Sequence, residues 1–440
     1  MSLQTPQRIR RLQRKLYELA KQKPDQRFHA LYDKVHREDV LAHAYALCRS
    51  NGGAPGVDGV TFEDIEAQGR TGWLEGLRKE LHQKTYEPSP VRRVMIPKPG
   101  GGERPLGIPT IRDRVAQTAA KLVLEPIFEA DFEDCAYGYR PKRSAQQAVK
   151  TVIRALRAGY SDVVDADLSK YFDTIPHAEL MKSVARRVVD RHMLRLIKMW
   201  LKVPVSERDA NGRERMSGGK SSSAGTPQGG VISPLLANIY MHRFLRAWRM
   251  RGKGDEFRAR IINYADDFVI LSRGNAVQAL AWTREVMKRI GLTLNEVKTR
   301  ICDGRKEHFD FLGYTFGPEY YRKDGRWYLT MKPSKKSVQR LKEKLRKVLR
   351  EGITEPWEDV CKRLNQTLVG WANYFNQGTR LMAYRAIHHS VRSAVRRFLR
   401  RRHKVSGRGT AVFSAKTIFG ELGVVQLIRL HLGPSAQATS

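Results

Sequence analysis

One segment near the middle of the chain limits the possible folds more than any other. Residues 260–271 read RIINYADDFVIL, in which apolar side chains flank a short polar centre on both sides. This pattern is typical of a β-hairpin, and here the turn would present Asp266 and Asp267. Two adjacent carboxylates between buried strands repel each other, and a bound divalent cation would remove that cost. The segment therefore predicts a buried hairpin with an acidic tip.

A second acidic strand is expected upstream. Residues 162–168, DVVDADL, are short and Val-rich, and alternate residues of a strand share a face, so Asp165 and Asp167 would point the same way. Alone, this segment is equally compatible with a strand end whose acids lie in solvent. Together with the acidic hairpin it favours two-metal nucleotidyl transfer, in which two Mg²⁺ ions activate a 3′ oxygen and stabilise the leaving pyrophosphate. Carboxylates from two elements would supply the oxygen ligands that Mg²⁺ requires.

The net charge of the chain limits which binding partners it can have. Its 440 residues contain 81 Lys and Arg against 45 Asp and Glu, a formal charge of +36, while the hydrophobic fraction of 41% is sufficient for a packed core. Such a field favours polyanions, with nucleic acid as the leading partner and an acidic membrane surface as the second. Four scattered cysteines without a CxxC pair argue against a zinc site or a disulfide framework. No apolar run is long enough to span a membrane.

The remaining pattern predicts an α+β chain that ends in helices. Residues 1–50 and 112–160 read as helical, residues 51–110 as turn-rich, and the two acidic segments as strands. After Pro333, helices are expected up to a stop at Gly352, over 357–369 and over 381–402. No Asp or Glu occurs between Val360 and Gly420. A solvated helix normally mixes both signs of charge, so this basic stretch favours a nucleic-acid-binding surface over a plain solvated face.

Several longer strings point to a family. GTPQGGVISPLLANIY at 225–240, YADD at 264–267 and DADLSKYFDTIPH at 165–177 closely resemble the reverse transcriptases encoded by group II introns. The resemblance continues, in the family's order, through IPKPGGGERPLGIPTIRDRVAQ, YGYRPKRSAQQA, GLTLNEVKT, FLGYTF and GWANYF. Ala136 and Tyr139 stand where the family more often has Ser and Phe. The paired cysteines of the family's zinc-bearing endonuclease domain do not occur.

The resemblance implies a right-hand polymerase with fingers, a palm built on an antiparallel sheet, a helical thumb and a small basic DNA-binding region. We expect these parts in the following order: a basic helical N-terminal extension over 1–50, fingers over 51–160, palm over 161–318, thumb or X (maturase) domain over 319–402, and the C-terminal DNA-binding region over 403–440.

The resemblance also assigns the metal-binding triad and a sugar gate. It implies Asp167, Asp266 and Asp267 as ligands of two Mg²⁺ ions, for which Mn²⁺ could substitute, with Asp165 as the competing acid in the first strand. It further implies that the ring of Phe172 excludes a ribose 2′ hydroxyl. The neighbouring Tyr171 is the alternative gate, and a core aromatic is the alternative role for Phe172.

The other residues carried over from the family contact nucleotide or template. Lys98 and Arg104 would flank the tip of a fingers hairpin and hold the triphosphate, although an exposed turn with solvated charges is the simpler reading. Lys298 would be the proton donor to pyrophosphate, or an ordinary surface lysine. The remaining candidates are Leu168 and Gln228 for the nucleotide, and Arg140, Lys142, Arg143, Gly229 and Tyr264 for template and primer.

We therefore expect an RNA-directed DNA polymerase that extends a DNA primer on an RNA template with deoxynucleoside triphosphates and also assists splicing of its intron RNA. The alternatives are an RNA-binding maturase whose polymerase activity is secondary, and an intron-like reverse transcriptase adopted for DNA repair. Template RNA, intron RNA and primer or target DNA would be its partners, without a membrane. The expected location is the bacterial cytoplasm, in association with the nucleoid or a ribonucleoprotein.

Overall fold

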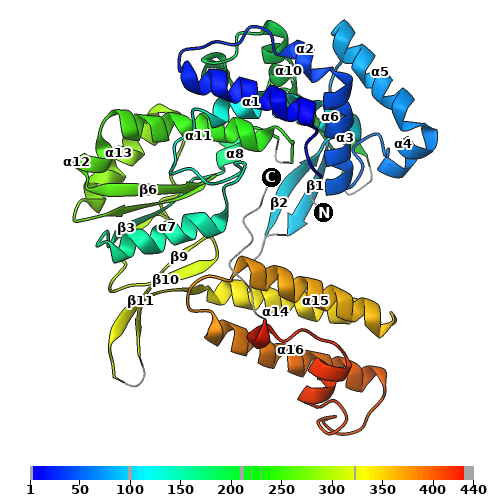
Figure 1. Cartoon of the computed structure of the whole chain (residues 1–440), viewed down its shortest axis with the longest axis vertical. Helices are drawn as coiled ribbons and strands as arrows, with labels where there is room; N and C mark the ends of the chain where they lie inside the picture. The colour runs from blue at the N-terminus through cyan, green and yellow to red at the C-terminus, as the bar shows by residue number, and fades with distance from the viewer. Residues whose placement is uncertain are drawn as a thin grey trace.

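The computed structural model of the chain describes residues 3–97, 102–208, 213–219, 221–227, 229–321 and 324–430. Figure 1 shows a helical upper body, a body of sheet and helices beside it, and a C-terminal bundle of helices below. Helices and sheets are thus mixed along the chain, and the predicted α+β class is confirmed.

The upper body is organised around one buried helix. Its helices are α1 (Gln7–Gln22), α2 (Tyr32–Val35), α3 (Glu38–Asn51), α4 (Phe62–Gln68), α5 (Arg70–Gln83), α6 (Ile111–Glu129) and α10 (Arg191–Leu201). Most residues of α6 are buried, and α1, α2 and α3 pack on it. Residues 51–110 are less turn-rich than expected, because a capping box of Thr61 and Asp64 starts α4 and α5 follows directly. The N-terminal helices share a hydrophobic core with the central sheet and so belong to the main fold.

A buried arginine fastens the end of α1 to the rest of the upper body. Arg187 is 2% exposed, and its guanidinium makes two hydrogen bonds of 2.9 Å to Asp131. The same guanidinium donates to the carbonyls of Ala20, Lys23, Pro24 and Gln26 at 2.6 to 3.0 Å. The chain that leaves α1 therefore wraps around a single side chain.

The central sheet has four antiparallel strands in the order β6-β7-β3-β8. Its strands are β3 (Asp162–Asp167), β6 (Ala259–Tyr264), β7 (Asp267–Ser272) and β8 (Arg300–Asp303). Helix α13 (Ala276–Arg289) contacts one face and α7 (Ala145–Arg157) the other, as Figure 1 shows. Successive residues of β3 accordingly enter different cores, Val163 on the α7 side and Val164 on the opposite side. The helices that complete this body are α8 (Tyr171–Thr174), α9 (His177–Ala185), α11 (Ser233–Met250) and α12 (Lys253–Glu256).

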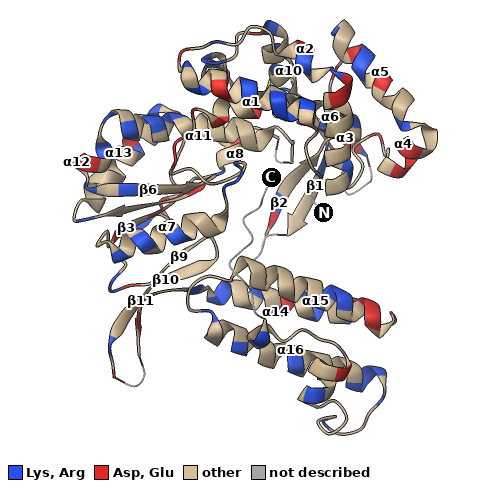
Figure 2. Ribbon diagram, viewed as in Figure 1, with Lys and Arg blue, Asp and Glu red and all other residues tan. Residues whose placement is uncertain are grey.

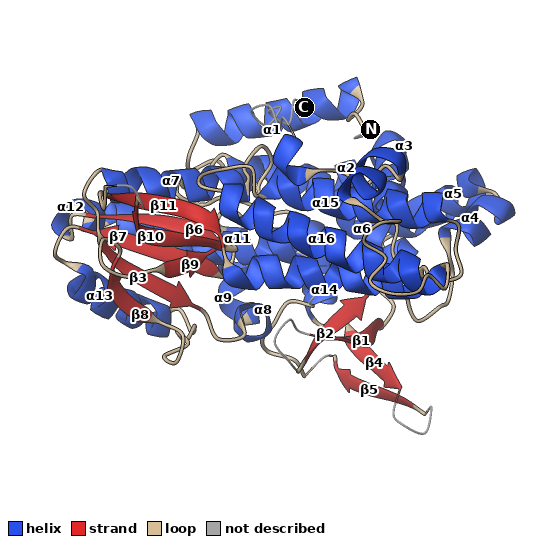
Figure 3. Ribbon diagram, turned by 90° about the horizontal axis from the view of Figure 1, so that it is seen from below, coloured by secondary structure: helices blue, strands red, loops and turns tan. Residues whose placement is uncertain are grey.

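A second sheet extends from the upper body. Strands β1 (Val91–Pro97) and β2 (Glu103–Ile108) form the predicted hairpin, with Pro97 opposite Glu103 at its described end. Strand β4 (Pro204–Arg208) pairs parallel to β1 and antiparallel to β5 (Glu214–Gly218). Figure 3 shows this sheet projecting from the helices.

The third sheet leads into the C-terminal bundle. It comprises β9 (Phe309–Phe311), β10 (Tyr314–Tyr320) and β11 (Trp327–Pro333), and the bundle comprises α14 (Lys335–Glu351), α15 (Trp357–Tyr374), α16 (Leu381–Arg402), a π-helical turn (Thr417–Glu421) and a 3₁₀ turn (Leu427–Arg429). The first and third long helices have the predicted bounds, whereas α15 runs on past residue 369 to Tyr374. In Figure 2, Lys and Arg recur along α16, which itself contains no Asp or Glu.

Three of the expected domain boundaries fall within packed units. The division at 318/319 falls inside β10, which pairs with β11 as far as Pro333. The division at 160 separates α7 from the central sheet that it covers. Residues 403–430 share a hydrophobic core with α14, α15 and α16. The division of the chain into fingers, palm and thumb therefore stays a prediction.

Candidate active site

The turn between β6 and β7 carries two of the predicted acids. The two strands pair up to Tyr264 opposite Asp267. Ala265 and Asp266 therefore form the turn, and Ala265 has a φ of 59°. This left-handed conformation is the one that two-residue hairpin turns use. The predicted hairpin is confirmed, with Asp266 in its turn and Asp267 at the first position of β7.

The third acid faces this turn from the neighbouring strand. Asp167 is the last residue of β3 and lies directly opposite Asp267. Its carboxylate accepts a hydrogen bond of 3.0 Å from Lys298 Nζ and another of 3.2 Å from Asn295 Nδ2. Three carboxylates from two elements thus meet at one end of the central sheet, and Lys298 lies beside them.

The competing acid has different surroundings. Asp165 pairs with Val269 on β7 and with Arg300 on β8. The Arg300 Nε lies 3.8 Å from Asp165 Oδ2. Burial raises the pKa of Asp165 to about 6, although Arg300 opposes the shift. A fixed cation therefore already neighbours Asp165, away from the hairpin turn.

Burial and the repulsion of neighbouring carboxylates make Asp266 and Asp267 costly to ionise. Burial raises the pKa of Asp267 to about 7, and the charges of Asp266 and Asp167 add to the shift. Burial also raises the pKa of Asp266. A divalent cation would relieve this repulsion, and hard oxygen donors from two elements fit Mg²⁺ or Mn²⁺. Over the described residues, no three His, Cys, Asp or Glu side chains already form a metal-binding group.

A cavity of about 490 Å³ opens beside Asp266. It is lined by Arg104, Leu106, Tyr139, Leu168, Lys170, Tyr171, Phe172, Gly229, Gly230, Ser233, Pro234 and Asp266. Arg104 comes from the β1–β2 hairpin and Phe172 from α8, so the cavity brings distant predicted residues together. Its volume is in the range of small-molecule sites.

The two candidate gate residues occupy different environments. Tyr171 is 2% exposed, and its hydroxyl donates a hydrogen bond of 2.6 Å to the Ala237 carbonyl. Phe172 is only partly buried and packs at the edge of the core. Its ring is therefore the less constrained of the two at the cavity, whereas Tyr171 is held within the protein.

The residues expected to contact template around residue 140 have partners within the protein. The Arg140 side chain is 4% exposed and pairs with Glu129, and it also donates to the carbonyls of Glu133 and Ala136. These bonds hold the loop together and occupy most of the Arg140 donors, so its expected contact with template stays a prediction. Arg143 pairs with Asp134 at 2.6 Å and remains partly exposed.

The remaining residues predicted to contact template, primer or nucleotide lie in different parts of the structure. Lys142 is exposed and has a φ of 60°. Gly229 also has a positive φ, and a side chain there would overlap the carbonyl of Gly107 in β2. The backbone of Gly229 therefore lies close to the β1–β2 hairpin. Tyr264 is partly buried against the α7 side of the sheet. Lys98 and Gln228 lie outside the described residues.

Sequence reasoning missed several members of the site. Lys170 and Ser233 line the cavity, and Asn295 contacts Asp167. Tyr139 also lines the cavity with its ring 49% exposed. Lys170 lies within the motif DADLSKYFDTIPH that contains Phe172, which was the available signal for it. Asn295 lies within GLTLNEVKT, close to Lys298, but its contact with Asp167 depends on the folding of distant segments.

The geometry is that of a nucleic acid polymerase, and family comparisons define the class more closely. Residues 96–316 match the family model for reverse transcriptase (RNA-dependent DNA polymerase), and residues 338–413 match the maturase-specific domain of group II introns. The chain is thus a reverse transcriptase with a right-hand polymerase fold. It belongs to the group II intron reverse transcriptase/maturase family.

Two similar proteins, YkfC and LtrA, agree with this assignment, whereas the similarity to one solved telomerase structure is too low to support it. Protein YkfC of Escherichia coli K12 is 37% identical over 343 residues, which cover 70% of this chain and 87% of that protein. The group II intron-encoded protein LtrA of Lactococcus lactis subsp. cremoris is 38% identical over 226 residues, which cover 50% of this chain and 35% of LtrA. A solved structure of apo telomerase from Candida tropicalis aligns at a TM-score of 0.42 and 13% identity, over 54% of this chain and 57% of that chain.

Reverse transcriptases depend on a divalent metal and act on RNA and DNA, so the coarse cofactor and substrate predictions are confirmed. The alternative in which polymerase chemistry is secondary is not favoured, because the reverse transcriptase match includes the acidic strand and hairpin. None of the helices within the described ranges is long and apolar enough to span a bilayer.

Proposed function

We propose that this chain extends a DNA primer on an RNA template with deoxynucleoside triphosphates, using Asp167, Asp266 and Asp267 to hold two Mg²⁺ ions. The observation that carries the proposal is the position of Asp167 directly opposite Asp267, next to Asp266, which lines a cavity. When bound, the two cations would activate the primer 3′ hydroxyl and neutralise charge on the leaving pyrophosphate.

Different residues of the cavity would contact different parts of the nucleotide. The planar guanidinium of Arg104 can hold phosphate oxygens from the fingers side. The ring of Phe172 lines the cavity and would leave no room for a ribose 2′ hydroxyl. Deoxynucleotides would therefore be preferred. Leu168 is 4% exposed and provides an apolar wall beneath the sugar. Lys98 and Gln228 remain proposed nucleotide contacts on the basis of the family resemblance.

Lys298 would supply the proton that pyrophosphate requires on departure. Its ammonium contacts Asp167, which raises the pKa of Lys298 through that hydrogen bond. The ammonium is protonated and carries the proton that pyrophosphate needs, but the raised pKa makes it a weaker acid, so its position beside the site is what favours this role. In the absence of substrate, the same ammonium offsets part of the negative charge at Asp167.

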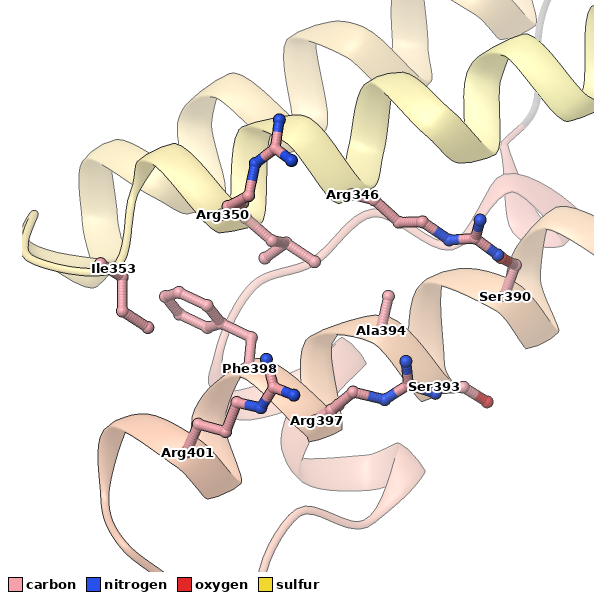
Figure 4. Close-up of a pocket in the computed structure, with 10 residues that line it drawn as sticks. Arg346, Arg350, Ile353, Ser390, Ser393, Ala394, Arg397, Phe398 and Arg401 are labelled. Atoms are coloured by element: carbon pink, nitrogen blue, oxygen red, sulfur yellow. The ribbon is translucent and has the colours of Figure 1, made fainter.

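The thumb would provide the nucleic-acid interface. A groove of about 510 Å³ between α14 and α16 is bordered by Arg346, Arg350, Arg397 and Arg401. Figure 4 shows these side chains around an apolar floor that includes Phe398. None of the four arginines has a carboxylate partner in the described part of the chain. Unpaired guanidiniums of this kind suit the backbone phosphates of template, primer or intron RNA.

We further propose that the maturase role uses this thumb surface on intron RNA, in a bacterial cytoplasmic ribonucleoprotein. Lys142, which is exposed, and Arg143, which is partly exposed, would contribute template and primer contacts together with Gly229 and Tyr264. The decisive experiment is extension of a DNA primer on an RNA template by the wild type and by Asp266→Ala. Full activity of the variant would overturn the assignment of the carboxylates.

A further inference from the structure

The ring of Phe172 contacts two other aromatic rings. Tyr171 meets it edge to face at 5.6 Å between ring centroids, and Tyr139 meets it in the same manner at 6.4 Å. Edge-to-face contacts of this kind are favourable and directional. Phe172 therefore has one neighbour within its own helix and a second from a distant part of the chain.

These two neighbours are fixed in different ways. Tyr171 is anchored in the core by its hydrogen bond to Ala237. Tyr139 is 49% exposed and has a φ of 56°. A bulky residue rarely adopts this left-handed conformation, and such residues persist only where the surrounding structure imposes the conformation. Burial of its own ring does not hold Tyr139 in place.

The segment that carries Tyr139 is instead bound to the acidic hairpin. Ala136 forms a parallel β-bridge with Asn263 of β6. The amide of Tyr137 donates to the Asn263 carbonyl at 2.8 Å, and the amide of Asn263 donates to the Cys135 carbonyl at 2.8 Å. These bonds attach residues 135–137 to the strand that leads into the Asp266 turn.

The closest approach between the two segments occurs at Gly138. A Cβ atom at this position would overlap the backbone nitrogen of Ala265 in the turn itself. The Gly138 carbonyl also accepts a hydrogen bond of 2.8 Å from Asn238 Nδ2 of α11. Tyr139 therefore follows a residue that is pressed against the acidic turn and bonded to the buried helix behind it.

We propose that Tyr139 is a positioning residue that holds the Phe172 ring in place and thereby couples sugar discrimination to the position of the Asp266 turn. A ring that faces an open cavity excludes a 2′ hydroxyl only if it cannot swing aside. Tyr139 limits that movement through its edge-to-face contact with the Phe172 ring. The ring of Tyr139, and not its hydroxyl, makes the contact. This inference rests on the proposed role of Phe172 as the sugar gate.

The test compares incorporation of deoxynucleotides and ribonucleotides by the full chain. For each variant, kcat/KM is measured for both nucleotides in single-nucleotide extension on an RNA template. Tyr139→Ala should lower the preference for deoxynucleotide roughly three- to tenfold, the scale of one lost edge-to-face contact. The change should appear mainly as a lower KM for the ribonucleotide. Tyr139→Phe should retain the wild-type preference, because it keeps the ring.

A double variant separates an effect through Phe172 from an independent one. If Tyr139 acts through Phe172, then Tyr139→Ala combined with Phe172→Ala should discriminate no worse than Phe172→Ala alone. Multiplication of the two effects, or an unchanged preference in Tyr139→Ala, would overturn the inference while leaving the gate assignment intact. An unchanged preference in Phe172→Ala would overturn the gate assignment itself, and the inference with it.

Gly138→Ala tests the connection to the turn independently of the gate. The added methyl group would push against Ala265, so kcat for deoxynucleotide and sugar discrimination should fall together. Gly76→Ala in α5 is the matched control, because open space surrounds that glycine. It should leave both quantities at their wild-type values. A Gly138→Ala enzyme that retained both quantities would refute the coupling.

Discussion

The Lys298 ammonium donates a hydrogen bond of 3.0 Å to the carboxylate of Asp167. This contact gives Lys298 two possible effects that can be separated by experiment. As a proton donor it should increase kcat, and as a cation beside the acids it should compete with Mg²⁺. We expect Lys298→Ala to lower kcat roughly 10²-fold, the lower end for general acid catalysis. The Mg²⁺ concentration for half-maximal activity should fall in the same variant.

Steady-state extension rates across a Mg²⁺ titration check both effects. Lys288→Ala is the matched control, since Lys288 is an exposed lysine near the end of α13. An unchanged kcat in Lys298→Ala would exclude Lys298 as the donor and leave it only an electrostatic role.

The choice between Asp165 and Asp167 can be tested with isosteric amides. We expect Asp167→Asn to abolish extension, because Asp167 faces the hairpin acids. Asp165→Asn should keep most activity, because Asp165 is paired with Arg300. Gel-based extension on an RNA template measures activity, and filter binding of the RNA shows that both variants still bind template. Loss of activity in Asp165→Asn alone would transfer the ligand role to Asp165.

Tyr171 offers a control for the gate at Phe172. Tyr171→Phe removes the hydroxyl that bonds to Ala237, so it should destabilise the fold by about 1 kcal/mol while keeping sugar discrimination. Phe172→Ala should instead admit ribonucleotides more readily with little loss of stability. Denaturant unfolding and paired extension assays measure the two effects. Relaxed discrimination in Tyr171→Phe, with none in Phe172→Ala, would make Tyr171 the gate.

Acid should weaken the fold through Asp190. Burial of Asp190 opposes ionisation, but its carboxylate accepts hydrogen bonds from the amides of Leu31, Tyr32, His192 and Met193, and the net effect is a lowered pKa. A carboxyl whose pKa is lower in the folded state stabilises the fold at pH values above its pKa in the unfolded chain, which is about 4. This stabilisation is lost as the pH falls through the pKa of the folded state.

Asp190→Asn should therefore cost about 2 kcal/mol at neutral pH, the scale of a charge-assisted hydrogen bond. The difference from wild type should shrink at low pH. Urea unfolding of both proteins between about pH 3 and pH 7 provides the measurement. A difference that stayed constant over that range would contradict the assignment.

The arginine groove of the thumb should determine much of the salt dependence of RNA binding. For each phosphate contact that is lost, the slope of log K against log salt should become shallower by about 0.7 to 0.9. We expect this change for Arg346→Ala with Arg350→Ala, and for Arg397→Ala with Arg401→Ala. Lys344→Ala, an exposed position on α14, serves as control. Equal slopes in all variants would place the interface elsewhere.

Local patterns predicted the elements that depend on neighbours in sequence. The alternation of Val and Asp in β3, the apolar runs of β6 and β7, and the spacing of apolar residues along α16 each report a buried face directly. The acids of the candidate site were accessible for the same reason, since they interrupt apolar strands. A two-residue turn fixes the relation of Asp266 to Asp267 without any distant contact.

Features that depend on distant partners were not predictable from local pattern. Arg140 looks like any basic loop residue until Glu129 and two carbonyls are seen to surround it. The sequence around Tyr320 gives no sign that β10 pairs with β11. That pairing joins residues on the two sides of the expected boundary at 318/319. The contact between Gly138 and the acidic turn likewise joins segments far apart in sequence.

The wrapping of the N-terminal chain around Arg187 has a consequence for synthesis of the protein. The four carbonyls that Arg187 binds precede it by 161 to 167 residues. At about 5 to 20 residues per second, a ribosome would need roughly ten to thirty seconds to add Arg187 after the end of α1. The apolar stripe of α1 would lack its final anchor throughout that interval. The nascent N-terminal chain therefore cannot reach its final contacts until Arg187 has been synthesised.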